Sequence, residues 1–277
     1  MSGVASVKAV FDRAAADGRA ALVGYLPAGF PSVAGGIDAM AAMADAGVDL
    51  VEVGLPYSDP LMDGPVIQQA VDGALKAGTT TTDVLATVEA LAGHGATAVV
   101  MSYWNPLERY GADRFIRDLA SAGGAGVITP DLIPDEAAQW MASARAAELA
   151  TVFLVAPSST ETRLALTTQA CSGFVYAAST MGVTGARDQV GGAAQHLVQR
   201  TRTVTDLPIG VGLGVSTAAQ AAQVAGFADG VIVGSALVRR LLDAESPAHG
   251  VADLASLASD LAAGVRQADR PAVASDA

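Results

Sequence analysis

Cysteine and histidine are scarce in this sequence, and their scarcity limits the metal and redox chemistry open to it. The single cysteine, Cys171, can form neither an intrachain disulfide nor a thiolate metal cage, and its apolar surroundings predict a small buried side chain. The three histidines, His94, His196 and His249, lie far apart, and none belongs to a pair at the spacing of metal ligands. We therefore expect no metal site in this chain.

Positive charge is also sparse. Lys and Arg number 16 against 28 Asp and Glu, which gives a net charge of −12. A chain with this excess of acid lacks the electrostatic footprint for nucleic acid or for an anionic membrane. No uninterrupted apolar run reaches the roughly 18–20 residues that a membrane-spanning helix needs, and charged residues interrupt the apolar ones at the N-terminus. The sequence therefore predicts a cytoplasmic protein that binds neither nucleic acid nor membrane.

Short β-branched runs that alternate with Ala-rich amphipathic segments are abundant. With 51% hydrophobic and 16% charged residues, the 277-residue chain has enough apolar surface for a large core. The predicted strands are residues 21–25, 49–54, 97–103, 125–129, 150–155, 173–177, 207–211 and 229–234. Apolar residues at helical spacing fill segments between them, namely 33–46, 83–92, 113–122, 135–147, 162–171, 193–203 and 217–225.

Eight such alternations in about 250 residues predict parallel strands with helical crossovers, and they favour an α/β fold of the single-domain (β/α)8 TIM barrel type. A doubly wound open sheet is the alternative. No shift in composition and no long linker divides the chain, so residues 1–270 are expected to form one domain, with residues 1–18 as an extra N-terminal helix. Residues 271–277 lack apolar periodicity, which predicts a disordered C-terminal tail. The Thr and Asp residues in 79–83 are typical of a helix cap.

Glu52 is an acidic residue inside a predicted barrel strand. It shares one face of the strand with Leu50 and Gly54, while two valines occupy the other face. Because both faces of a barrel strand are covered, the carboxylate should be withdrawn from water, which raises its pKa toward the range useful to a general acid or base. A buried Glu held in an ion pair is the alternative interpretation.

The loop after this strand, residues 55–67, is stiffened by three prolines and carries two acids, Asp59 and Asp63. One of the two is expected to form a turn by bonding nearby amides, and the other to face a ligand. We favour Asp63 for the ligand side. Two carboxylates at one barrel mouth allow one acid to stay ionised while the other holds a proton, and reacting groups in this fold gather at the carboxyl ends of the strands.

Three further strand ends carry side chains that can contact a ligand. Tyr103, Asp131 and Tyr176 lie at the ends of the predicted third, fourth and sixth strands. The tyrosine rings can wall a flat apolar ligand and donate a hydrogen bond, or they can pack at the rim with the phenol in solvent. Trp104 and Trp140 are interpreted as packing residues.

Glycines dominate the last three predicted loops, around Gly185, Gly214 and Gly234. Glycine lets backbone amides approach an anion closely, and the short helix that Ser235 opens adds the positive end of its dipole. A phosphate site in the loops after strands seven and eight is common in TIM barrels. The pattern therefore predicts a phosphorylated ligand.

At this point the sequence resembles a known family. The stretch VEVGLPYSDPLMDGP (residues 51–65) closely resembles the signature of the tryptophan synthase α chain family. The resemblance continues in family order through YWNP, PDL, MGVTG, GLGVS and DGVIVGS, which begin at residues 103, 130, 181, 212 and 229.

The resemblance implies a lyase that splits indole-3-glycerol phosphate into indole and glyceraldehyde 3-phosphate by a retro-aldol cleavage. It implies Glu52 as the acid/base and Asp63 as the acceptor of the indole N–H. The substrate-binding set is expected to be Tyr103, Tyr176, Thr184, Gly185, Gly214, Gly234 and Ser235. The resemblance also implies no cofactor in this chain, and a β chain carrying pyridoxal phosphate that receives the indole in an α2β2 assembly.

Four residues depart from the family pattern. Pro27 and Phe30 stand where many members have Thr and Asp, Thr180 replaces a common Arg, and Met62 replaces a smaller residue. None of them removes a predicted proton-transfer group, but they alter segments expected at the partner interface and in loop closure. A lyase that releases indole without a partner, and a barrel kept as a non-catalytic regulatory subunit, are the alternative functions.

Overall fold

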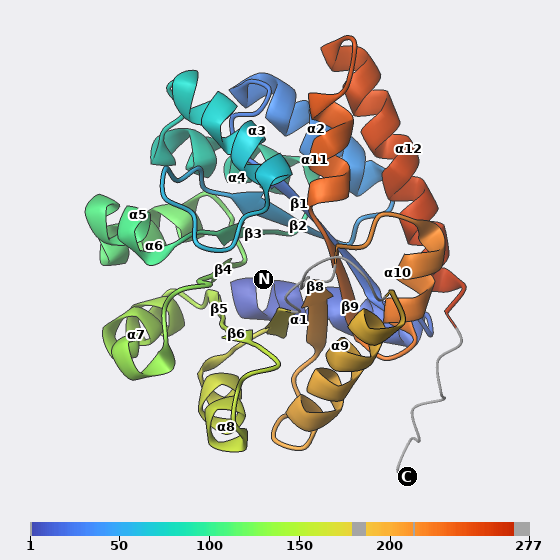
Figure 1. Ribbon diagram of the computed structural model, residues 1–277. Coiled ribbons are helices and arrows are strands. Elements are labelled where there is room, and N and C mark those ends of the chain that lie inside the picture. The colour runs from blue at the N-terminus through green and yellow to red at the C-terminus, as the bar shows by residue number, and fades with distance from the viewer. Residues whose placement is uncertain (1, 179–186, 213, 269–277) are drawn as a thin grey trace.

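Parallel strands alternate with helices along the chain (Figure 1), and the computed structural model describes residues 2–178, 187–212 and 214–268. The strands are β1 (Ala21–Pro27), β2 (Leu50–Gly54), β3 (Ala98–Met101), β4 (Gly126–Ile128), β5 (Ala150–Val152), β6 (Leu154–Val155), β7 (Val175–Ala178), β8 (Ile209–Gly212) and β9 (Gly230–Val233).

The helices are α1 (Gly3–Ala16), α2 (Val33–Asp45), α3 (Pro65–Lys76), α4 (Thr81–His94), α5 (Trp104–Tyr110), α6 (Ala112–Ser121), α7 (Ala138–Ala146), α8 (Glu161–Ala170), α9 (Arg187–Arg202), α10 (Ala218–Ala225), α11 (Ser235–Leu242) and α12 (Pro247–Arg266). A 3₁₀ turn, η1 (Pro134–Glu136), precedes α7. In Figure 1 the helices surround the strands.

The strands form a ring. Each pairs in parallel with its neighbours in the order β5-β4-β3-β2-β1-β9-β8-β7-β6. β5 and β6 belong to the run predicted as one strand, residues 150–155, and only Phe153 separates them, so the chain itself closes the ring. At this break the Phe153 N–H donates to the Sγ of Cys171 (3.4 Å). The predicted TIM barrel is confirmed, and the open-sheet alternative is wrong.

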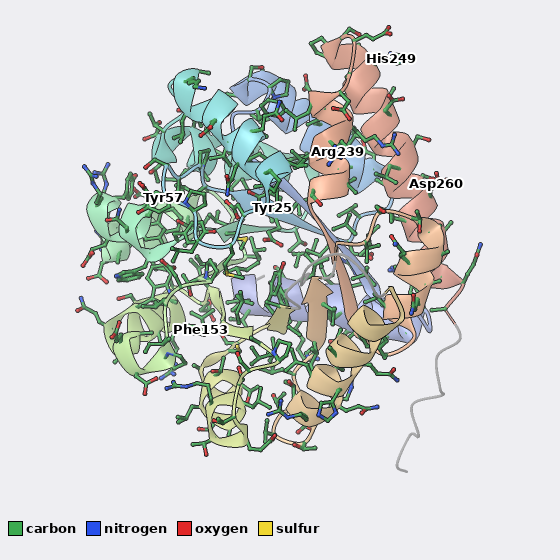
Figure 2. The ribbon with its side chains drawn as sticks, viewed as in Figure 1. Tyr25, Tyr57, Phe153, Arg239, His249 and Asp260 are labelled. Atoms are coloured by element: carbon green, nitrogen blue, oxygen red, sulfur yellow. The ribbon has the colours of Figure 1, made fainter. Side chains whose placement is uncertain are left out.

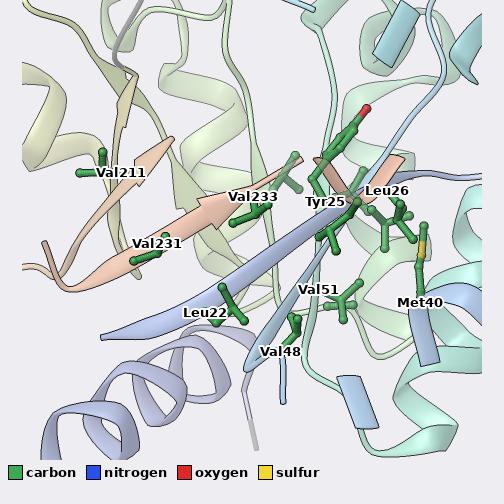
Figure 3. Packing of buried hydrophobic residues seen from close by; sticks show 14 of the residues in the cluster. Leu22, Tyr25, Leu26, Met40, Val48, Val51, Val211, Val231 and Val233 are labelled. Carbon is green, nitrogen blue, oxygen red and sulfur yellow. The ribbon is translucent and has the colours of Figure 1, made fainter. Parts of the chain in front are cut away.

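The two faces of the strands build two cores. Val51 and Val53 of β2 point outward into the layer between strands and helices, part of which is drawn in Figure 3. Leu50 points inward and belongs to a second cluster of buried side chains, which includes Val99 of β3 and Phe174, the residue before β7. Glu52 has the same parity as Leu50 along β2, so it points into the barrel, as the alternation predicted.

Helix α1 closes the end of the barrel at which the strands begin. Its buried side chains, which include Val7, Val10 and Phe11, pack with the interior core. The ring centroids of Phe11 and Phe174 are 5.3 Å apart. Figure 1 shows α1 lying across the middle of the ring. The predicted extra N-terminal helix is confirmed, and it leaves the opposite end of the barrel free for the loops that follow the strands.

Helix α4 begins with the cap that residues 79–83 predicted. The Thr80 hydroxyl accepts the Asp83 N–H (3.4 Å), and the Asp83 carboxylate accepts the Thr80 N–H (2.8 Å). Each side chain thus satisfies a backbone donor of the first turn.

Three helices were not among the predicted elements. Residues 65–67 were expected in a loop, but α3 begins at Pro65, because a proline at the first helical position lacks only an N–H that has no partner there anyway. The predicted third strand, residues 97–103, was too long, because β3 ends at Met101, and the unpredicted helix α5 begins at Trp104. Helix α12 completes the outer layer against α2, α10 and α11. The predicted tail, residues 271–277, lies outside the described residues.

Candidate functional site

The carboxyl ends of β1, β2, β7, β8 and β9 surround a cavity of about 170 Å³. Six of the predicted site residues line it: Glu52, Asp63, Tyr176, Gly214, Gly234 and Ser235. Its remaining lining residues are Tyr25, Met62, Ile67, Met101, Gly212 and Ile232. The cavity therefore brings together two acids, two phenols, apolar side chains and glycine-rich backbone from segments far apart in the sequence.

Glu52 is 1% exposed. Its Oε2 has no hydrogen-bond partner among the described residues, and no cation of that part of the chain pairs with it. Burial raises the pKa of Glu52 to about 8, and the negative charge of Asp63 contributes to the shift. The alternative of a buried Glu held in an ion pair is therefore wrong for the described part of the chain, and Glu52 can hold or release a proton near neutral pH.

Asp63 is the loop carboxylate that reaches the cavity. Its Oδ1 accepts a hydrogen bond from the Tyr103 hydroxyl (3.2 Å). Burial raises the pKa of Asp63, and the bond from Tyr103 opposes that rise. Asp59, in contrast, is exposed and accepts a hydrogen bond from the Ser58 hydroxyl (2.6 Å). The two acids of the loop thus have different surroundings, and only Asp63 lies beside Glu52.

Tyr103 lies behind Asp63 and is not on the cavity wall. Its hydroxyl accepts the Met62 N–H (3.0 Å) as well as donating to Asp63, so one phenol holds two neighbouring points of the loop. The Tyr57 ring packs on Tyr103 with centroids 5.5 Å apart, and Asn105 donates to the Tyr57 hydroxyl (3.0 Å). Burial, with the charge of Asp63, raises the pKa of Tyr103 to about 12. The phenol therefore stays protonated and can keep donating.

Tyr176 is on the cavity wall, and its hydroxyl lies over Gly212. A Cβ on Gly212 would sit 2.7 Å from that oxygen, so only glycine leaves room for the phenol. Burial, followed by the charges of Glu52 and Asp63, raises the pKa of Tyr176 well above its usual value. Tyr176 is therefore a neutral O–H beside two acids.

Glycine backbone and the start of α11 form the side of the cavity opposite the loop. Gly214 has φ +63°, a left-handed conformation that glycine adopts without strain. The short helix predicted to begin at Ser235 is present as α11, and no side chain of a described residue caps its N-terminus. Its first amides are thus available to an anion. Thr180, Thr184 and Gly185 lie outside the described residues.

Other strand-end predictions belong to the framework. Asp131 accepts the Trp104 N–H (2.9 Å) at the start of α5. The rings of Trp104 and Trp140 meet edge to face with centroids 5.5 Å apart, which confirms them as packing residues. Cys171 is buried as predicted, and burial raises the pKa of its thiol to about 12.

Tyr25 is the site residue that the sequence analysis missed. It is the last residue of the predicted first strand, and this position was the available signal, because the fold places reacting groups at the carboxyl ends of strands. Figure 2 shows Tyr25 near the centre of the ring of elements and Tyr57 toward α5.

Within the described ranges, no group of three or more His, Cys, Asp and Glu could hold a metal ion. The same ranges contain no helix long and apolar enough to cross a membrane.

Sequence comparison matches nearly the whole chain to one family. The model of the family described as "Tryptophan synthase alpha chain" matches residues 11–266. The tryptophan synthase alpha chain of Salinispora arenicola is 60% identical over 256 residues, which cover 92% of this chain and 96% of that protein. That of Mycobacterium intracellulare is 59% identical over 258 residues, 93% of each chain.

Solved structures give the same family. A structure of Mycobacterium tuberculosis tryptophan synthase contains a chain that superposes with a TM-score of 0.88 at 57% identity, over 94% of this chain and 98% of that one. The tryptophan synthase subunit alpha of Legionella pneumophila superposes with a TM-score of 0.87 at 29% identity, over 96% and 98% of the two chains. The likeness extends over the barrel and includes the strands that carry the cavity.

Proposed function

The chain belongs to the tryptophan synthase α chain family and is a lyase that cleaves indole-3-glycerol phosphate, and on that premise we propose that Glu52 and Asp63 carry out the cleavage. The observation that supports this assignment is the pair of carboxylates in one cavity with different environments. Glu52 is buried, and its Oε2 has no hydrogen-bond partner among the described residues, whereas Asp63 accepts a hydrogen bond from the Tyr103 hydroxyl. Such a pair suits two roles, one acid holding a proton while the other stays ionised.

Glu52 moves the protons at the carbon end of the reaction. Cleavage of the bond at indole C3 needs a proton on C3 and the loss of a proton from a hydroxyl of the glycerol chain. With a pKa of about 8, Glu52 is mostly protonated at neutral pH, so it can deliver its proton to C3. The carboxylate that remains then accepts the hydroxyl proton as the carbon–carbon bond breaks, which restores the acid.

Asp63 acts at the other edge of the indole ring. Protonation at C3 gives the ring nitrogen positive character, and an ionised carboxylate that accepts the N–H stabilises this charge. The hydrogen bond from Tyr103 lowers the pKa of Asp63 against the effect of burial and therefore favours the ionised form. In this proposal Tyr103 positions Asp63, and Tyr176 lies against the substrate as a neutral phenol.

The phosphate of the substrate binds on the glycine side of the cavity. The backbone at Gly214, Gly234 and Ser235 and the uncapped start of α11 support this placement, because free amides at a helix N-terminus attract anions. Thr184 and Gly185 are kept in the proposed set on the family resemblance alone. The amides offset the repulsion between a phosphate and a chain with a net charge of −12.

Members of this family work with a β chain. For this chain we propose an α2β2 assembly in the cytoplasm. In that assembly indole passes to a β chain that carries pyridoxal phosphate, and this chain holds no cofactor of its own.

Indole release from indole-3-glycerol phosphate tests the assignment of the two acids. Without a β chain, Glu52→Gln and Asp63→Asn should each lower kcat by at least about 100-fold, because each removes one role in the transition state. Asp59→Asn changes an exposed acid of the same loop and is the matched control, so it should keep the wild-type kcat. Activity of Asp63→Asn equal to that of Asp59→Asn would refute the assignment.

The proposed assembly has its own test. Adding a β chain should speed wild-type turnover, and the sedimentation mass of the mixture checks the α2β2 stoichiometry.

A further inference from the structure

The Tyr25 hydroxyl is a polar group of the cavity that the mechanism above does not use. Tyr25 is 7% exposed and lines the cavity with Glu52 and Asp63. Its ring packs in the hydrophobic core, and its hydroxyl forms no hydrogen bond with another described residue. A phenol O–H on the wall of a cavity can donate a hydrogen bond to a ligand that enters it.

The register of the barrel fixes where this hydroxyl lies. Tyr25 on β1 pairs directly with Glu52 on β2, so the two side chains stand next to each other in the barrel. The Tyr25 ring extends from there toward the mouth and lies over Gly54, where a Cβ would overlap the hydroxyl. Figure 3 shows the Tyr25 hydroxyl directed away from the labelled apolar side chains.

The other edge of the ring faces the phosphate side. A Cβ on Gly234 would lie 3.3 Å from the Tyr25 Cδ1, so the ring passes close to the backbone before α11. β1 is also bonded to both β2 and β9, the strands that lead to Glu52 and to Gly234. Tyr25 therefore stands between the acid/base and the phosphate amides, beside the path that the glycerol chain of the substrate must follow.

The Tyr25 hydroxyl is protonated and can therefore donate a hydrogen bond. Burial, followed by the negative charges of Asp63 and Glu52, raises the pKa of Tyr25 well above its usual value. The hydroxyl therefore keeps its proton throughout the neutral range.

We propose that Tyr25 is a specificity residue, whose O–H donates a hydrogen bond to a hydroxyl of the glycerol chain in bound indole-3-glycerol phosphate. The inference rests on the proposed placement of the ring at Asp63 and of the phosphate at Gly234 and Ser235. The proposed bond explains why the site would prefer a substrate whose three-carbon group carries hydroxyls over one whose group carries none. A site built to bond a hydroxyl rejects a ligand that lacks it.

The test compares two ligands that share the ring and the phosphate. Indole-3-glycerol phosphate carries the hydroxyls, and indole-3-propanol phosphate, measured as a competitive inhibitor, does not. Tyr25→Phe should lower kcat/KM for the first roughly 3- to 10-fold, the worth of one neutral hydrogen bond. The inhibition constant of the second should change less than about 2-fold, since it makes no such bond.

Tyr110→Phe is the matched control. Tyr110 donates to Asp118 (2.7 Å) outside the cavity, so this variant also removes a phenol hydroxyl near a carboxylate. It should leave both constants at their wild-type values. The pH profile of kcat/KM should keep its shape in Tyr25→Phe, because the proposed bond goes to the substrate and not to Glu52 or Asp63.

Three results would overturn the inference. Equal weakening of both ligands by Tyr25→Phe would indicate a change in cavity shape, a shifted pH profile would indicate action through the acids, and no effect would leave the hydroxyl without a role. A wild-type protein that binds neither ligand would instead refute the proposed function on which the inference rests. These failures are distinguishable, because the last one is seen without any variant.

Discussion

A buried carboxylate without a partner is unfavourable for folding, and Glu52 is such a group within the part of the chain that the structure describes. Transfer of an unpaired charge out of water costs several kcal/mol, so the folded chain keeps Glu52 protonated over much of the neutral range. In the proposed mechanism this proton on Glu52 is the one delivered to the substrate. The same burial that raises the pKa of Glu52 lowers the free energy of unfolding, a trade-off that is common for active sites.

The pH dependence of stability should report the buried proton on Glu52. Its pKa rises from 4.5 to about 8 on folding, so the folded chain holds a proton that the unfolded chain has released. The resulting stabilisation is present below about pH 4.5 and is lost as pH rises through about 8. The free energy of unfolding of Glu52→Gln, measured with urea, should not fall in this way as the pH rises. At pH 9 the variant should be more stable than the wild type by a few kcal/mol.

Glu108→Gln, at an exposed acid, provides the control for that experiment and should follow the wild-type curve. If Glu52→Gln and Glu108→Gln show the same pH dependence, the carboxylate of Glu52 is not held in a low-dielectric environment.

At the scale of elements, local signals explain where several helices begin. The cap residues Thr80 and Asp83 were visible in the sequence, and α4 starts there. Pro65 is ambiguous in the sequence, because a proline after Asp-Gly suits a turn in a stiff loop as well as the first position of a helix, and only the structure shows that α3 begins there. The end of a strand is harder to locate, since Ser102 and Tyr103 stay buried after β3 has ended, just as strand residues do.

Removal of the α4 cap should destabilise the fold by a small and local amount. Thr80→Ala deletes the side-chain oxygen that accepts the Asp83 N–H, and such a change costs about 1 kcal/mol. Thr82→Ala alters an exposed threonine in the same turn and should change stability by less than about 0.5 kcal/mol. Urea unfolding at pH 7 compares the two, and equal midpoints would show that the cap contributes nothing.

Across the whole molecule, the two ends of the barrel have separate tasks. The end at which the strands begin is closed by α1 and contributes packing, while the opposite end carries the cavity and both acids. The separation of packing at one end from the cavity at the other follows from the parallel arrangement, because all strands finish on the same side.

Phe11→Ala tests this division. Phe11 is 4% exposed and packs on Phe174 and over Gly230, so the truncation should lower the free energy of unfolding by about 3–5 kcal/mol. The folded variant should keep kcat within about 2-fold at low temperature, since no cavity residue changes. Lys8→Ala on the exposed face of α1 removes only a surface ion pair with Asp12 and should cost less than about 1 kcal/mol. A loss of kcat in folded Phe11→Ala would contradict the separation of the two ends.

The sequence by itself determined the barrel and the burial of Glu52. Alternating apolar runs specify parallel strands with helical crossovers, and strand alternation directs Glu52 to the interior, because both effects depend on periodicity along the chain. The tertiary structure decided which loop acid enters the cavity and which phenols surround it. Asp63 is held by Tyr103, 40 residues away, and Tyr25 meets Glu52 only through the pairing of β1 with β2. Contacts of this kind depend on register and loop geometry, and no local pattern encodes them.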